Sequence, residues 1–172
     1  MKLLLLLLSL YSCVNADLSN INSFEADFTQ TINNESTKEL SYTGHIIASK
    51  PQYALWKYQT PVEKDIYISM YKLTIIEPDM EQVIVQNISP EFNLFKMLKD
   101  AKRIKKNTYQ TQIKDTKYTI KTKDNDVIES IYYVDELDYK VLIHFSNQKL
   151  NQNINAKLFM PKIPLGYDLI SQ

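Results

Sequence analysis

Residues suited to catalysis or metal binding are few in this 172-residue chain, and they are poorly arranged for either task. The two histidines, His45 and His144, belong to no HxxxH or HExxH pattern and have no neighbouring cysteine, so we predict no metal site. No GxSxG elbow occurs. The only glycines are Gly44 and Gly166, which excludes glycine-rich dinucleotide and phosphate loops. We therefore predict a protein that is not an enzyme, with no catalytic residue and no cofactor.

Charge gives no sign of a nucleic-acid partner. Lysine and arginine number 20 and aspartate and glutamate also number 20, whereas nucleic-acid-binding domains are usually basic. The acidic residues fall at turns and on the polar faces of strands, where solvation explains them. We find no pair of carboxylates whose spacing argues for acid–base chemistry.

The first sixteen residues are typical of a secretory signal peptide. Lys2 supplies the positive end, an apolar run follows from Leu3 to Leu10, and Val14-Asn15-Ala16 offers small residues for cleavage. We predict that residues 1–16 are removed, leaving one exported domain over residues 17–172. The only cysteine, Cys13, leaves an alternative open: it could be a lipid-anchored N-terminus, although the bulky Tyr11 is unusual in a lipoprotein cleavage box. Either way, no disulfide forms.

Alternating apolar and polar residues predict a β-rich fold. In Ser23–Ile32, the side chains of Phe24, Ala26 and Phe28 share one face, as in a half-buried strand. Lys50-Pro51 marks a corner between two such strands, and Gly44 marks a bend or a close approach of chains. Similar runs predict further strands at 39–49, 53–59, 65–70, 71–77, 82–88, 109–114, 117–121, 127–134, 139–146 and 153–160. The prolines and glycine of 159–170 predict a tail that wraps an edge.

One helix interrupts the strands. Ser89-Pro90-Glu91 resembles a helix start, and Phe92, Leu94, Phe95 and Leu98 follow at helical spacing. The basic residues between Lys96 and Lys106 suit its second half and exit. They are either a solvated helix end or a contact for an acidic partner or anionic lipid.

A sheet of ten or eleven strands must curl or close. We predict a mainly β fold: a curved, incompletely closed antiparallel β-barrel with a short helical lid. The inward apolar residues either form a dry core or line a cavity for a long apolar ligand. In the second interpretation the cavity is lined by Phe24, Phe28, Tyr42, Ile46, Ala48, Trp56 and Ile68, and the lid residues are Phe92, Leu94, Phe95 and Leu98.

Four segments resemble the periplasmic outer-membrane lipoprotein carrier family, LolA. They are the opening strand Ser23–Gln30, the pattern Gly44…Lys50-Pro51…Trp56-Lys57-Tyr58…Pro61, the segment Tyr71…Glu81-Gln82-Val83 and the closing stretch Pro164–Ile170. The resemblance spans nearly all of residues 17–172. It implies an unclosed barrel whose apolar cavity lies under a helical lid.

The resemblance also implies a function and partners. It implies a monomeric periplasmic chaperone that takes acylated lipoproteins from an inner-membrane ABC transporter and delivers them to an outer-membrane acceptor. Lys50 stands where the family usually has an arginine that latches the lid, and lysine is a point donor where arginine offers a fork. Ala54 stands where a larger apolar residue is common. The alternative function is a lipid-binding acceptor or structural lipoprotein anchored through Cys13.

Overall fold

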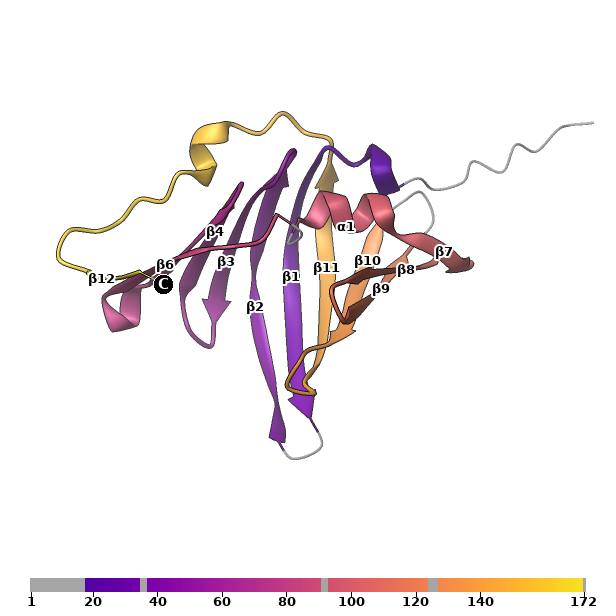
Figure 1. The fold of residues 1–172 in the computed structure, drawn as a ribbon, viewed down its shortest axis with the longest axis horizontal. Coiled ribbons are helices and arrows are strands. Elements are labelled where there is room, and N and C mark those ends of the chain that lie inside the picture. The colour runs from indigo at the N-terminus through magenta and orange to yellow at the C-terminus, as the bar shows by residue number, and fades with distance from the viewer. Residues whose placement is uncertain (1–17, 35–36, 91–92, 124–126, 172) are drawn as a thin grey trace, which may run out of the picture.

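A single strongly curved sheet forms the body of the protein. The computed structural model describes residues 18–34, 37–90, 93–123 and 127–171. Twelve strands follow one another in the order β12-β6-β5-β4-β3-β2-β1-β11-β10-β9-β8-β7, so the edge strands β12 and β7 are not paired with each other. The sheet is thus an open half-barrel, with α1 lying across the upper part of its hollow side (Figure 1).

The elements follow the alternation of the sequence closely. The strands are β1 (Ser23–Asn34), β2 (Thr37–Ser49), β3 (Tyr53–Thr60), β4 (Lys64–Ser69), β5 (Lys72–Glu77), β6 (Gln82–Asn87), β7 (Lys102–Lys105), β8 (Thr108–Ile113), β9 (Thr116–Thr122), β10 (Ile128–Val134), β11 (Lys140–Leu150) and β12 (Asp168–Ser171). The helical elements are α1 (Leu94–Asp100) and the 3-10 turns η1 (Leu18–Asn20), η2 (Pro78–Met80) and η4 (Ala156–Phe159). The six strands predicted between residues 23 and 88 are confirmed by β1 to β6, which pair in sequence order.

Three details of the prediction were wrong. The helix begins at Leu94, not at Ser89-Pro90-Glu91, because the side chain of Asn93 caps its first amides. The helix also ends early: Lys102–Lys105 forms the edge strand β7 instead of continuing it. The segment 153–160 is not a strand, since the side chain of Asn155 caps η4 there.

The tail carries the chain across to the far edge of the sheet. From β11 it passes η4 and then adds β12 parallel to β6 (Figure 1). Phe159 in η4 is buried and stacks on Tyr53, with ring centroids 5.5 Å apart. The predicted wrapping of an edge is therefore confirmed.

Close packing at Gly44 holds the centre of the sheet together. Gly44 lies opposite Phe28 on β1, and the Phe28 ring occupies the space that a side chain would take. A Cβ built on Gly44 would lie 2.1 Å from the carbonyl oxygen of Lys57 and 2.6 Å from Cζ of Phe28. The predicted close approach at Gly44 is confirmed, and only glycine fits there.

The outer face of β1 carries a charged network instead of a core. His45 Nδ1 lies 2.7 Å from Oδ1 of Asp27, and the amide of Asn147 donates to Oδ2 of Asp27 over 2.7 Å. Lys149 pairs with Glu25 at 2.9 Å. The hydrogen bond from Asn147, followed by that from His45, holds the pKa of Asp27 below its usual range. These groups tie β1 to β2 and β11 on the face opposite the apolar one.

Candidate functional site

An apolar cavity lies between α1 and the hollow face of the sheet. Its volume is about 290 Å³, close to the lower end of the range for small-molecule sites. It is lined by Gln52, Tyr53, Ala54, Trp56, Ile68, Asn93, Leu94, Phe95, Met97, Ile113, Tyr118, Ile131, Tyr133 and Ile143. These residues come from β3, β4, α1 and the four strands β8 to β11, so both arms of the half-barrel contribute.

The helix α1 forms the roof of the cavity because Asn93 fixes its start. The Asn93 side-chain oxygen accepts hydrogen bonds from the amides of Phe95 and Lys96, at 2.9 and 3.2 Å. Its amide nitrogen donates to the carbonyl oxygen of Pro51 over 2.9 Å. One side chain therefore caps the helix and ties it to the corner between β2 and β3.

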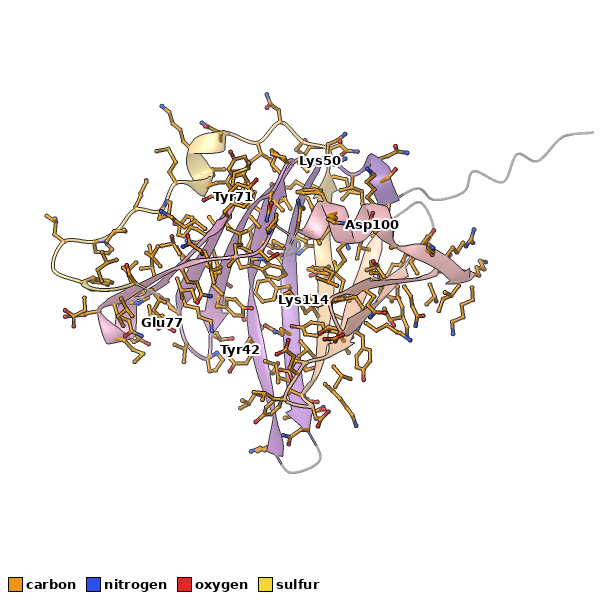
Figure 2. The ribbon with its side chains drawn as sticks, in the orientation of Figure 1. Tyr42, Lys50, Tyr71, Glu77, Asp100 and Lys114 are labelled. Carbon is orange, nitrogen blue, oxygen red and sulfur yellow. The ribbon has the colours of Figure 1, made fainter. Side chains whose placement is uncertain are left out.

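The sequence predicted some of the lining residues. Trp56, Ile68, Leu94 and Phe95 all line the cavity. Phe24, Phe28, Ile46, Ala48 and Leu98 are instead fully buried in the core that supports it, and none of them is among the lining residues. Tyr42 is half-buried beside Tyr58, with ring centroids 5.9 Å apart, nearer the opposite end of the sheet (Figure 2). Phe92 lies outside the described residues.

The ammonium group of Lys50 contacts the N-terminal turn. Its Nζ donates to the carbonyl oxygen of Ser19 at 3.0 Å and to Oδ1 of Asn22 at 2.9 Å. Figure 2 shows Lys50 at the same end of the sheet as α1. Lys50 also borders a hollow with Asn93 and Lys99 of the lid region. The structure thus places Lys50 beside the lid, and its part as a latch stays a prediction.

Ten of the fourteen lining residues were not assigned from the sequence. Ile131 and Tyr133 alternate along β10, and Ile143 lies in β11. Met97 lies on the buried side of α1. Period-two alternation could have suggested Ile131 and Tyr133 as inward-facing, but nothing local indicates that they meet Trp56 across a void.

The wall is uncharged. Among the described lining residues none is lysine, arginine, histidine, aspartate or glutamate. Burial raises the pKa of Tyr133 to about 12 and also raises the pKa of Tyr118. Both hydroxyls therefore keep their protons at neutral pH and can donate hydrogen bonds.

The described residues hold no group of three or more metal-ligating side chains. In the same part of the chain, no helix has the length and hydropathy needed to cross a membrane. What the geometry offers is an uncharged, partly roofed hollow, which suits binding of an apolar molecule.

The family model and the sequence relatives point to one family. Residues 19–118 match the family model described as outer membrane lipoprotein carrier protein LolA. An outer-membrane lipoprotein carrier protein from Campylobacter jejuni is 40% identical over 151 residues, which is 88% of this chain and 88% of that protein. One from Wolinella succinogenes is 32% identical over the full length of both chains. A LolA superfamily protein of known structure from Nitrosomonas europaea shares the fold, with a TM-score of 0.52 at 13% identity, covering 85% of this chain and 94% of that one.

Proposed function

Since this chain belongs to the LolA family of outer membrane lipoprotein carrier proteins, we propose that its cavity under α1 shields the acyl chains of lipoproteins in transit. The protein is a periplasmic lipoprotein chaperone of the carrier type, and its task requires no chemical step. The observation that carries the proposal is the cavity of about 290 Å³, whose described walls bear no charge.

Such a wall favours hydrocarbon over water. Each methylene removed from water contributes about 0.8 kcal/mol, so even part of one acyl chain in the cavity would hold the cargo firmly. Trp56 and Ile68 on the sheet side and Leu94 and Phe95 on α1 would make the principal contacts. Phe24, Phe28, Ile46 and Ala48 would act indirectly, by supporting that wall from the core.

Access would depend on α1. We expect the Asn93 hydrogen bond to the Pro51 carbonyl to break when α1 lifts, since the two groups belong to opposite sides of the entrance. Lys50 would help to hold the closed position, because it ties the β2–β3 corner to the N-terminal turn beside α1. Leu98, which is buried, would support the lid from the core, and Phe92, which lies outside the described residues, stays a predicted member of it.

The compartment and the partners belong to the same proposal. Residues 1–16, which lie outside the described residues, would direct export and be removed after Ala16. The carrier would then receive lipoproteins from an inner-membrane lipoprotein-releasing ABC transporter and pass them to an outer-membrane acceptor. An intact mass that begins at Asp17 would support this route, whereas a lipid-modified Cys13 would support the anchored alternative.

A release assay tests the function directly. Inner-membrane vesicles that carry a tagged lipoprotein and the releasing transporter are supplied with ATP and the purified protein. We expect the lipoprotein to appear in the supernatant in a one-to-one complex with the carrier. If the lipoprotein stays with the vesicles while a related carrier releases it, the proposed function is wrong.

A further inference from the structure

A second hollow adjoins the cavity. It measures about 360 Å³ and lies between the β8–β9 turn and the β10–β11 turn. It is lined by Ile113, Lys114, Thr116, Tyr118, Tyr133, Asp135, Glu136 and Leu137. Three of these residues, Ile113, Tyr118 and Tyr133, also line the cavity, so the two spaces share a wall. We call this second space the turn hollow; Lys114 marks its β8–β9 side in Figure 2.

Polarity changes from the cavity to the turn hollow. The cavity wall is uncharged, whereas the turn hollow is bordered by Lys114, Asp135 and Glu136. Tyr118 and Tyr133 lie at the junction, with ring centroids 4.9 Å apart. Their rings continue the apolar wall, and their hydroxyls are protonated at neutral pH and can donate hydrogen bonds.

A third space, on the lid side, also borders the cavity, but the residues that separate it from the cavity belong to the lid region. It shares Asn93 and Phe95 with the cavity. Asn93 is hydrogen-bonded to the Pro51 carbonyl, and Phe95 is buried. Ile113, Tyr118 and Tyr133 on the other side are half-buried, and they lie in β8, β9 and β10 and not in α1. A polar chain can therefore leave toward the turn hollow without displacing α1.

The geometry points to the turn hollow as the site of the polar end of the cargo. We infer that the acyl chains lie in the cavity while the glyceryl-cysteine and the first residues of the attached polypeptide pass over Tyr118 and Tyr133 and out between the two turns. The acyl chain would lie in the apolar cavity, the ester group beside the two tyrosines, and the polypeptide at the charged rim. Polarity would thus increase in the same direction along the cargo and along the protein. The inference rests on the proposed function and adds which part of the cargo occupies which space.

Site-specific photo-crosslinking tests the path. Benzoylphenylalanine replaces Leu137, which is 74% exposed at the turn hollow, or the exposed Lys99 at the lid-side space in a matched variant. The probe is diacylglyceryl-cysteine followed by six uncharged polar residues, and mass spectrometry identifies the crosslinked part. We expect adducts on the peptide from Leu137 and few from Lys99. Peptide adducts mainly from Lys99, or acyl adducts from Leu137, would overturn the inference.

The hydroxyls provide a second, independent readout. The double change of Tyr118→Phe and Tyr133→Phe keeps both rings and removes two donors. Each lost hydrogen bond weakens binding about fivefold, so we expect roughly a 25-fold loss for the lipopeptide. The affinity for an unsubstituted long alkane, which has no polar end, should stay unchanged. Equal affinity of wild type and variant for the lipopeptide would overturn the role of the hydroxyls.

The proposed function and the assignment of the turn hollow are refuted by different results. If the wild-type protein binds neither the lipopeptide nor the alkane, the proposed function fails and this assignment fails with it. If both ligands bind but the crosslinks arise at the lid side, only the assignment of the turn hollow fails.

Discussion

A charge placed in the cavity wall should weaken acyl binding by an amount that depends on pH. The change is Trp56→Glu. The control is Trp56→Gln, because glutamine has the shape of glutamate but carries no charge. Trp56 lines the cavity and is half-buried, and its ring contacts Phe28 and Phe145, with centroid distances of 5.1 and 6.5 Å. Both variants lose these contacts, so their comparison isolates the charge.

The size of the expected loss of affinity follows from the composition of the cavity wall. None of the described lining residues is cationic, so a carboxylate covered by an acyl chain would have no partner and would take up a proton. From an ordinary glutamate pKa of about 4.3, this protonation costs about 3.7 kcal/mol at about pH 7, which is a 500-fold loss of affinity at most. At about pH 5 the same cost falls to about 1 kcal/mol, or roughly sixfold.

A fluorescent sixteen-carbon fatty acid that brightens on leaving water serves as the probe, and circular dichroism checks that both variants fold. We expect the ratio of dissociation constants, Glu variant over Gln variant, to rise steeply from about pH 5 to about pH 7. A ratio near one at both pH values would show that acyl chains do not cover position 56, which would refute the assignment of the cavity.

Three further changes test the supports of the site. Gly44→Ala should cost about 3 kcal/mol in urea unfolding, because the new methyl group would overlap the Lys57 carbonyl, whereas an unchanged urea midpoint would contradict that packing. Asn93→Ala removes the helix cap and the hydrogen bond to Pro51, so the local free energy of opening of α1 should fall by about 1–2 kcal/mol. The α1 amides should then exchange hydrogen faster, and unaltered exchange would argue against this anchor. Asp27→Asn should lower stability by at most about 1 kcal/mol at neutral pH. Because the folded pKa of Asp27 is lowered, its contribution is present above the ordinary value of 3.8 and is lost as pH falls, so wild type and variant should converge in acid; a constant difference would exclude this linkage.

The sequence predicted most strands because alternation is a local property. Of the strand segments expected, the only one absent is 153–160, where apolar residues recur but Asn155 favours a capped turn. The two strands that it missed lie at the edges. In Lys102–Lys105 all four residues are exposed and three are cationic, and in Asp168–Ser171 all four are exposed, so neither shows an alternation of burial. Such edges are defined by a neighbouring strand and not by their own pattern.

The start of α1 also depends on a contact that the local sequence does not show. Ser89-Pro90 has the composition of a helix start, yet Asn93 performs the capping because its amide can also reach the Pro51 carbonyl. That carbonyl belongs to a corner far away in the sequence. A tertiary contact therefore decides which of the two possible capping residues is used.

By itself, the sequence determined which side chains share a strand face, that Gly44 marks a bend or a close approach of chains, and which family the motifs indicate. Only the tertiary structure decided which of those apolar side chains are packed and which border empty space. Phe24 and Ile46 have the same local signature as Trp56, but they are buried in the core and only Trp56 lines the cavity. The reason is physical: alternation fixes the direction of a side chain, whereas a void depends on the curvature of twelve strands and the height of α1 above them.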